Sequence, residues 1–358
     1  MYKILHIVTT IERGGAEKQL LILATKQVQA GNLVEIIFLK GKGTLTKEFV
    51  NAGCMVISDC ANQPITYQWR LVQRRIKENC NVAHAHLPLA EVILSMCSKK
   101  ESIFISSRHN VEPFYPKYDN ILSSILSRIV TSRFNGVICI SNSVLEFLVS
   151  RKEVARKKMH TVYYGSDKAN VSLNSHRVRG KNLSEIKIGT ISRHEPQKDL
   201  TTLLSGVALL GINENWHLTM VGQGSLSAKL HSHAEQLGLE ERINWIQESA
   251  NVAEVYNELD IFALSSLYEG LGLVLVEAMQ FNIPIIAARN SAIVEVLGTE
   301  YPYFFETSNI EDFFAVLTKL IHDLRNGYEP SYRAQLSKFD PESMQENMLR
   351  FYRRCEKL

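Results

Sequence analysis

The sequence predicts an α/β fold built from two doubly wound parallel sheets, and three observations support this prediction. Short apolar runs alternate with longer helical patterns from the first residues onward, which is typical of βαβ units around a parallel sheet. The alternation stops in a polar, turn-rich segment, residues 168–185, and then starts again. The length of 358 residues also exceeds what one hydrophobic core usually serves, so two domains are expected.

The strand candidates follow one another in a regular order. In the first half they read KILHIVT, LVEIIFL, CMVIS, VAHAH, SIFIS, GVICI and TVYY. In the second half they read IKIGTI, WHLTMVG, INWI, DIFALS, IPIIAA and YFFE. The sequence therefore predicts an N-terminal domain over residues 1–167 and a C-terminal domain over residues 168–338. The last segment, 339–358, is amphipathic, with Asp340 as N-cap and Pro341 at the first helical position. We expect this helix to pack back on the N-terminal domain.

Composition and charge limit the class of protein. Hydrophobic residues make up 45% of the chain and charged residues 22%, which is typical of a globular protein and excludes a disordered one. Residues 1–170 carry 23 Lys and Arg against 13 Asp and Glu, whereas the remainder carries 17 against 24. A basic half suits an anionic partner, and a dispersed solvated surface is the alternative interpretation. Interleaved aromatic residues and a known binding module are missing, so no nucleic-acid partner is expected.

The cysteines and the apolar runs indicate the compartment. Six cysteines form no C-x-x-C pair, which indicates a reducing environment. The opening MYKILHIVTT is too short and too rich in β-branched residues for a signal peptide. No run approaches the roughly 18 apolar residues that a membrane span needs. The expected location is the cytoplasm, with at most a peripheral position on the inner face of a membrane.

Two glycine pairs follow predicted strands. In open parallel sheets, ligands bind at the carboxyl ends of strands, where glycine loops and helix N-termini offer N–H groups to anions. Gly14 and Gly15 follow the first strand, and Gly222 and Gly224 follow WHLTMV. The second pair is similar to a dinucleotide fingerprint, but Ser227 stands at its third glycine position. A Rossmann oxidoreductase is therefore an alternative without further support.

Two further junctions carry charge. Arg193 and Lys198 lie in the loop of TISRHEPQKDL, where two cations suit a pyrophosphate. In YEGLGLVLVEAM, Glu269 lies in a loop, a helix begins near Gly272, and Glu277 lies inside that helix. A helical spacing of eight residues separates the two carboxylates by about 12 Å along the axis, beyond the roughly 5–9.5 Å of glycoside hydrolase pairs. We therefore expect separate roles, one of them the recognition of a vicinal diol.

Together these junctions resemble glycosyltransferase family 4, the retaining nucleotide-sugar glycosyltransferases of the GT-B fold. The Glu-x7-Glu segment EGLGLVLVE carries the most specific part of the resemblance, and AMQFNIPIIA continues it. The motifs ISRHEPQK, VGQG and GGAE match in the same order, so the resemblance covers nearly the whole chain. It implies two Rossmann-like domains that face a cleft.

The resemblance also implies a role for each motif residue. Glu277 would bind the ribose hydroxyls, and Glu269 would contact or orient the donor sugar. His109, in SSRHNVEPF, matches the active-site histidine beside the transferred sugar. The diphosphate would be held by Arg193 and Lys198 and by backbone at Gly15, Gly272 and Leu273, with Gly222 and Gly224 in the same donor-binding set. Three positions depart from the family pattern: Tyr164 replaces an asparagine, Gln247 replaces a glycine, and no double glycine precedes Glu295.

The function that the resemblance implies is retaining transfer of a hexosyl unit from a UDP- or GDP-linked sugar to an acceptor hydroxyl. The expected acceptor is a saccharide, and in particular a lipid-linked saccharide in surface polysaccharide or glycan assembly. The sequence holds no Asp-x-Asp, so no metal and no other cofactor is expected. The alternatives are a nucleotide-sugar 2-epimerase or hydrolase of the same architecture and a non-catalytic nucleotide-sugar-binding protein.

Two further patterns concern a metal and a membrane. His84 and His86 alternate on one predicted strand and could chelate zinc, but no third ligand stands nearby in the sequence, so no metal site is expected. The basic run RKEVARKK, residues 151–158, and the amphipathic NILSSILSRIVTSR, residues 120–133, favour docking on an anionic bilayer.

Overall fold

The computed structural model describes residues 1–78, 80–99, 101–115, 120–166, 184–211, 214–247 and 251–357. The chain divides into two compact units. Unit 1 comprises Met1–Asp167 together with Lys338–Leu358, and unit 2 comprises Lys168–Ser337. The predicted linker, residues 168–185, lies outside the described residues except for its last two.

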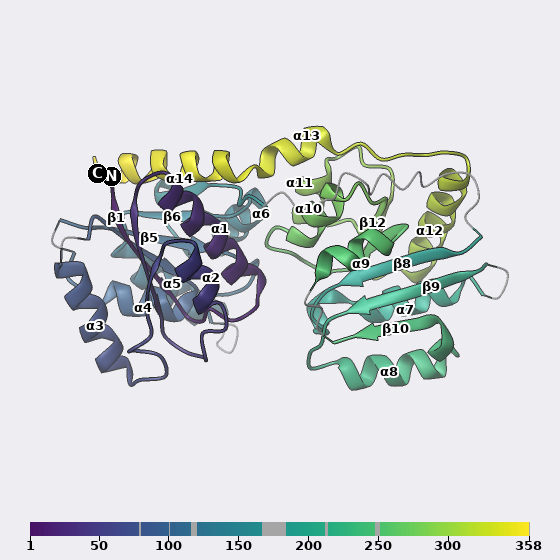
Figure 1. The fold of residues 1–358 in the computed structure, drawn as a ribbon, viewed down its shortest axis with the longest axis horizontal. Coiled ribbons are helices and arrows are strands. Elements are labelled where there is room, and N and C mark those ends of the chain that lie inside the picture. The colour runs from purple at the N-terminus through teal and green to yellow at the C-terminus, as the bar shows by residue number, and fades with distance from the viewer. Residues whose placement is uncertain are drawn as a thin grey trace. The chain divides into compact units, whose positions relative to one another are not determined.

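Unit 1 is built on a seven-stranded parallel sheet of order β3-β2-β1-β4-β5-β6-β7. Its strands are β1 (Lys3–Val8), β2 (Leu33–Phe38), β3 (Met55–Ile57), β4 (Val82–His86), β5 (Ile103–Arg108), β6 (Gly136–Cys139) and β7 (Met159–Thr161). Its helices are α1 (Gly15–Gln29), α2 (Thr46–Asn51), α3 (Ile65–Lys77), α4 (Pro88–Ser95), α5 (Asn120–Ser132), α6 (Asn142–Ser150) and α14 (Pro341–Glu356) (Figure 1).

Unit 2 has a six-stranded parallel sheet of order β10-β9-β8-β11-β12-β13. Its strands are β8 (Ile186–Ile191), β9 (Trp216–Val221), β10 (Ile243–Ile246), β11 (Ile261–Leu264), β12 (Ile285–Ala288) and β13 (Phe304–Phe305). Its helices are α7 (Leu200–Ala208), α8 (Ser227–Gln236), α9 (Val252–Glu258), α10 (Leu273–Gln280), α11 (Ser291–Leu297), α12 (Ile310–Arg325) and α13 (Arg333–Leu336).

The predicted α/β class with two doubly wound parallel sheets is confirmed. One boundary was wrong, because the seventh strand ends at Thr161 and does not run through TVYY to Tyr164. Tyr164 is instead fully buried, and its hydroxyl donates to Ser107 Oγ at 2.8 Å. In both sheets the strand order reverses between two adjacent strands, β1 and β4 in unit 1 and β8 and β11 in unit 2. Such switch points are where open α/β sheets bind ligands.

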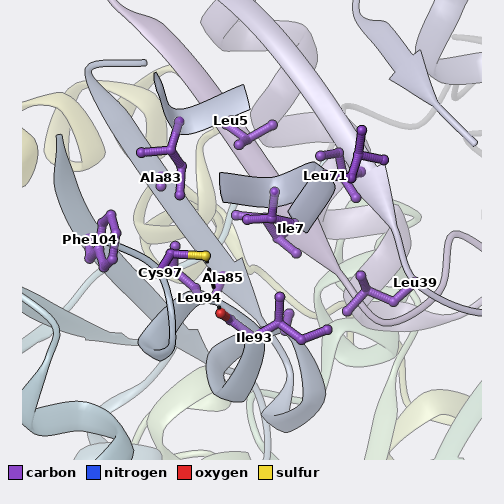
Figure 2. Packing of buried hydrophobic residues seen from close by; sticks show 14 of the residues in the cluster. Leu5, Ile7, Leu39, Leu71, Ala83, Ala85, Ile93, Leu94, Cys97 and Phe104 are labelled. Carbon is purple, nitrogen blue, oxygen red and sulfur yellow. Dashed lines mark hydrogen bonds between the residues drawn. The ribbon is translucent and has the colours of Figure 1, made fainter. Parts of the chain in front are cut away.

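Alternation along the strands of unit 1 separates two kinds of sheet face. Leu5 and Ile7 of β1 point into a buried apolar cluster with Ala83 and Ala85 of β4 and residues of α3 and α4. Figure 2 shows this cluster, in which the Cys97 thiol donates to the Ile93 carbonyl oxygen at 3.4 Å. Because successive side chains of a strand point to opposite faces, His6, His84 and His86 lie on the other face, which α1 and α14 cover.

Helix α14 belongs to unit 1, where it contacts α1 and β5. Asp340 is its N-cap, accepting a hydrogen bond from Ser343 N at 2.9 Å, and Pro341 follows as predicted. Two glycines let this segment approach closely. A Cβ on Gly165 would lie 2.5 Å from the Pro341 Cα, and one on Gly136 would overlap the Phe351 ring. Within the described residues, no helix is long and apolar enough to cross a membrane.

A buried charge cluster fixes the end of β5 in unit 1. Arg108 Nε lies 2.8 Å from a carboxylate oxygen of Glu91, and its Nη1 lies 3.5 Å from Glu153. Both carboxylates are completely buried, and burial raises the pKa of Glu91 while Arg108 opposes that rise. The guanidinium also stacks 4.5 Å from the centre of the Phe114 ring. Removing the Arg108 charge would leave the Glu91 carboxylate without its cation, whereas Glu153 would keep Arg151, whose Nε lies 2.8 Å from it.

We predict that Arg108→Met lowers the free energy of unfolding by about 3–5 kcal/mol, since it leaves the fully buried Glu91 carboxylate without its cation, while Glu153 keeps Arg151. The pKa of the Glu91 carboxyl, which burial already raises, would then lose the opposing effect of Arg108, so its unfavourable contribution should be smaller at pH 5 and grow as pH rises. Urea unfolding followed by circular dichroism measures both effects. The matched control is Arg350→Met, which breaks an ion pair with Glu346 whose side chains are 71% and 69% exposed and should change little. Equal losses in both variants would contradict the prediction.

Candidate active site

The loops that follow β8 and β11 join at the switch point of unit 2. Lys198 Nζ donates to Glu269 Oε1 at 2.6 Å, and the two side chains are only 12% and 8% exposed. Ser266 Oγ donates to the same carboxylate oxygen at 2.6 Å. The lysine ammonium has three donors, so its bond to Glu269 leaves capacity for an anion. The structure thus joins two residues to which sequence analysis gave separate roles.

The backbone around this ion pair is cross-linked. Leu267 N donates to the Gln197 carbonyl oxygen at 2.8 Å, and Gln197 Nε2 donates to the Tyr268 carbonyl oxygen at 2.8 Å. Ser265 Oγ donates to the Lys198 carbonyl oxygen at 2.8 Å. These bonds hold the two loops in one arrangement before any ligand arrives, which is the condition for a preorganised charged site.

Arg193 lies in the same loop as Lys198 but is exposed. Its guanidinium carries no ion pair within the part of the chain that the structure describes. The nearby Glu195 has a lowered pKa, chiefly because Ser225 donates to its carboxylate and, to a smaller extent, because of the Arg193 charge. Arg193 therefore offers a free cation at the carboxyl edge of the sheet.

Helix α10 begins directly after the Glu269 loop. Gly272 is its N-cap and adopts the left-handed conformation with φ of 78°, which strongly favours glycine. Leu273 is the first helical residue, so its N–H belongs to the helix end that has no intrahelical acceptors. The described geometry thus places N–H groups and the positive end of a helix dipole beside the Lys198–Glu269 pair.

Glu277 lies one turn further along α10 and is held by a buried tyrosine. Tyr256 Oη donates to Glu277 Oε2 at 3.0 Å and to the Val274 carbonyl oxygen at 3.2 Å. The pKa of Tyr256 is raised well above its ordinary value, first by burial and then by the Glu277 charge, so the hydroxyl keeps its proton. Tyr256 carries no sequence signal for this role, because it lies on α9, 21 positions before Glu277, and only the fold brings the two side chains together.

The predicted glycine pair of β9 lines a pocket of about 380 Å³. Gly222 and Gly224 share this pocket with His194, His231 and Trp245. A Cβ on Gly222 would overlap the Ser192 carbonyl oxygen, and one on Gly224 would lie 2.5 Å from the His194 carbonyl oxygen. The glycines are therefore required for the close approach of two loops, whatever the pocket holds. Sequence analysis did not single out Trp245, since one aromatic residue at a strand end carries no recognisable signal.

The other predicted residues lie in unit 1 and are described within that unit. Gly15 is the first residue of α1, and the space around its Cα is open. His109 follows β5 and is 7% exposed, and burial lowers its pKa to about 4. Its Nε2 lies 3.3 Å from His86 Nδ1, and its ring packs edge-on against Tyr164. His109 is therefore a neutral imidazole at neutral pH.

The expectation that His84 and His86 have no third ligand nearby was wrong. Because β1 pairs with β4, His6 lies opposite His84, and the ligand atoms of the three histidines are within 4.8 Å of one another. His6 Nδ1 lies 2.9 Å from His86 Nε2, which is a hydrogen-bond distance. Both nitrogens of His84 also have hydrogen-bond partners, Tyr352 and Ser107. The sequence separation of about 80 residues hid this contact, which arises from the strand order.

Chemically, unit 2 presents cations, a helix N-terminus and two oriented carboxylates along one edge of its sheet. Cations and backbone N–H groups bind a phosphorylated group, and a carboxylate with free oxygen lone pairs binds neighbouring hydroxyls. Unit 1 presents an uncharged imidazole at the corresponding edge of its own sheet. The arrangement within unit 2 suits a ligand that combines a diphosphate with sugar hydroxyls.

Comparisons with known proteins agree with this chemistry. Residues 172–338 match the family described as glycosyl transferases group 1, and residues 13–170 match the one described as glycosyltransferase family 4. The capsular polysaccharide biosynthesis glycosyltransferase CapH of Staphylococcus aureus is 26% identical over 322 residues, covering 87% of this chain and 86% of CapH. The N-acetylgalactosamine-N,N'-diacetylbacillosaminyl-diphospho-undecaprenol 4-alpha-N-acetylgalactosaminyltransferase of Campylobacter jejuni is 21% identical over 271 residues, 73% of this chain and 69% of that enzyme.

A solved structure supports the fold. Anabaena Alr3699/HepE, in complex with UDP and glucose, superposes with a TM-score of 0.81 at 19% identity, covering 98% of this chain and 99% of that protein. At this identity the likeness establishes the fold alone, which is the GT-B pair of Rossmann-like domains.

We predict that Gly222→Ala destabilises unit 2 by at least about 2 kcal/mol, because the new methyl group meets a backbone carbonyl at a φ of 137°. Gly211→Ala is the matched control, since Gly211 also has a positive φ but open space around it, and it should cost about 1 kcal/mol. Urea denaturation compares the two variants. A Gly222 variant as stable as the Gly211 variant would show that the close approach is not required.

Proposed function

This chain belongs to glycosyltransferase family 4, and on that premise we propose that it transfers a hexosyl unit from a nucleoside diphosphate sugar to an acceptor hydroxyl with retention of anomeric configuration. The observation that carries this proposal is the buried Lys198–Glu269 pair beside the N-terminus of α10. A diphosphate leaving group gains negative charge as the glycosidic bond breaks. Fixed cations and N–H groups stabilise that charge most when they are in place beforehand.

In this proposal each half of the donor has its own partners. Lys198 and Arg193 bind the diphosphate together with the backbone N–H of Leu273, so the charge compensation needs no metal ion. Glu269, fixed by Lys198 and Ser266, contacts the hexose. Glu277, oriented by Tyr256, accepts hydrogen bonds from the ribose hydroxyls. The pocket with Trp245 takes the base, because an aromatic wall and a volume of about 380 Å³ suit a planar ring.

Retention follows from where the acceptor hydroxyl attacks. We propose same-face attack through an oxocarbenium-like state, in which the departing phosphate oxygen accepts the proton of the acceptor. The bond between the anomeric carbon and the phosphate oxygen breaks as the new glycosidic bond forms, so no enzyme nucleophile takes part. His109, as a neutral imidazole, contacts the transferred sugar. Exclusion of water favours transfer over hydrolysis.

For the acceptor we propose a saccharide, carried on a lipid, in the assembly of a surface polysaccharide. The supporting observations are the names of two relatives, a capsular polysaccharide enzyme and an enzyme that acts on a diphospho-undecaprenol saccharide. HepE was crystallised with UDP and with UDP-glucose, which supports a uridine donor ahead of a guanosine one.

We predict that Glu277→Ala weakens the binding of UDP or GDP by about 10- to 100-fold, because a hydrogen bond to a charged group contributes about 1.5–3 kcal/mol. Titration calorimetry against UDP, GDP and their hexose conjugates measures the loss and identifies the base. Glu258→Ala on the neighbouring helix α9 removes the same charge from an exposed position and should leave affinity unchanged. Unchanged affinity in the Glu277 variant would remove its assigned role.

Incubation with donor alone tests the alternative functions. Release of free sugar or of an epimer from donor alone would favour a hydrolase or an epimerase.

A helix face of unit 1 supports a peripheral position on the inner face of a membrane. On α5, Ile121, Leu122, Ile125 and Ile129 are 49–70% exposed and recur at positions that share one side of a helix. Exposed cations lie on the same helix (Arg128), directly after it (Arg133) and shortly after α6 (Lys152, Arg156 and Lys157). An amphipathic helix flanked by cations fits an anionic bilayer, which would also present a lipid-linked acceptor.

We predict that the protein sediments with vesicles containing anionic lipid at low salt, and that Ile125→Asp with Ile129→Asp releases it. Each substitution removes an apolar contact and adds repulsion from the anionic surface, so binding should fall at least about tenfold. Val50→Asp on α2, where the side chain is 54% exposed, is the control and should still bind. Failure of the unchanged protein to bind anionic vesicles would contradict membrane docking and leave the transferase proposal intact.

A further inference from the structure

A chain of hydrogen-bonded, buried side chains connects His109 to Gln27 in the last turn of α1, and the proposed chemistry does not use it. His109 Nε2 lies 3.3 Å from His86 Nδ1, and His86 Nε2 lies 2.9 Å from His6 Nδ1. His6 Nε2 in turn lies 2.7 Å from Gln27 Oε1. His6 and Gln27 are completely buried, and His86 is 1% exposed. The chain therefore ends at an amide that solvent does not reach.

The orientation of the Gln27 amide decides which atom is the donor in each hydrogen bond of this chain. A distance of 2.7 Å is normal for N–H···O but short for a bond between two nitrogens, so the amide oxygen faces His6. The other end of the amide lies 3.3 Å from Tyr352 Oη, a distance that suits the NH₂ group better than an oxygen. His6 must therefore carry its proton on Nε2, because only a donor can bond to the Gln27 carbonyl oxygen.

The proton position on His6 fixes the proton position on each following histidine, provided that each ring is neutral. Burial lowers the pKa of His6 to about 4 and the pKa of His86 well below its ordinary value, so each ring has one N–H and one lone pair. His6 Nδ1 is then an acceptor, and His86 donates to it from Nε2. His86 Nδ1 is an acceptor in turn, and His109 donates to it from Nε2. The remaining nitrogen of His109, Nδ1, carries a lone pair and has no partner within the described part of the chain.

A second branch from Gln27 supports this assignment. Because the Gln27 amide nitrogen donates to Tyr352 Oη, the tyrosine hydroxyl is free to donate to His84 Nδ1 at 2.8 Å. His84 then donates from Nε2 to Ser107 Oγ at 2.8 Å, and Ser107 also accepts from Tyr164. The Tyr164 ring packs edge-on against His109, so the second branch ends beside the residue at which the first begins. Every member of both branches thus finds a donor or acceptor of the right kind.

We propose that Gln27 is a positioning residue that acts through His6 and His86 to fix His109 as the Nε2–H tautomer, so that Nδ1 faces the substrate as a hydrogen-bond acceptor. This inference rests on the proposed function, in which His109 contacts a hydroxyl of the transferred sugar. An Nδ1 lone pair accepts from a sugar hydroxyl and can orient it, whereas the opposite tautomer would present a donor. Gln27 itself touches no substrate in this scheme.

The tautomer can be read directly without substrate. A long-range ¹H–¹⁵N correlation spectrum of histidine-labelled protein, assigned with single His→Gln variants among the 11 histidines, distinguishes Nε2–H from Nδ1–H. We expect Nε2–H for His6, His86 and His109 in the unchanged protein. Gln27→Met removes the carbonyl acceptor, so His109 should become a mixture of both tautomers. Gln19→Met is the matched control, because Gln19 is a buried glutamine of the same helix that takes no part in the hydrogen bonds from Gln27 to His109. In this variant His109 should keep its tautomer.

Activity supplies the second readout. Loss of an orienting partner typically costs about 10- to 100-fold, so Gln27→Met should lower kcat for transfer by at least about tenfold. UDP affinity should stay unchanged, since the nucleotide does not reach His109 in this scheme. The proposal is overturned by Nδ1–H on His109 in the unchanged protein, by an unaltered His109 spectrum in a folded Gln27 variant, or by one tightly held zinc at His6, His84 and His86. The spectroscopic test needs no transferase activity. A failure of the tautomer assignment can therefore be distinguished from a failure of the proposed function.

Discussion

The ion pair between Lys198 and Glu269 is the interaction on which the proposed donor site depends. A buried ion pair contributes little net stability, because desolvation of the two charges offsets most of their attraction. The effect of this ion pair is to fix the positions of two loops. It joins the loops after β8 and β11, which are neighbours at the switch point of unit 2, and it holds a cation where we propose that the diphosphate binds. The backbone hydrogen bonds around Gln197 and Ser265 make that position independent of a ligand.

The two units use the same topology for different electrostatics. In unit 2 the switch point carries cations, carboxylates and the N-terminus of α10, and Arg193 remains exposed to solvent. In unit 1 the switch point lies between β1 and β4, and its side chains are imidazoles that burial keeps uncharged. Charge stabilisation and neutral hydrogen bonding are thus assigned to separate sheets. In the proposed reaction the diphosphate gains negative charge while the sugar must be oriented without attracting a counter-charge, and this division suits both requirements.

The last helix ties the end of the chain into unit 1. Tyr352 of α14 is fully buried and bonds to His84 and Gln27, although these residues are separated from it by 268 and 325 positions. Gly136 and Gly165 provide the space for this approach, since side chains there would meet Phe351 and Pro341. A helix that packs in this way contributes a hydroxyl to the hydrogen-bond chain as well as apolar surface to the core. Its sequence periodicity reveals only the apolar part of that role.

The sequence by itself determined the strands, their order along the chain and the motifs that led to the proposed donor site. These features are local, because alternation, turn residues and a Glu-x7-Glu segment all act within a few residues of each other. The strand TVYY was misplaced since an apolar run does not say whether it pairs with a neighbour or fills a core, as Tyr164 does. Only the tertiary structure decided that Lys198 meets Glu269, that Tyr256 holds Glu277, and that His6 joins His84 and His86. The contact of Lys198 with Glu269 arises because β8 lies beside β11, and that of the histidines because β1 lies beside β4, whereas Tyr256 reaches Glu277 from the helix before β11 to the helix after it. The order of strands in a sheet is set by crossover connections that leave no periodic signal in the residues they bring together.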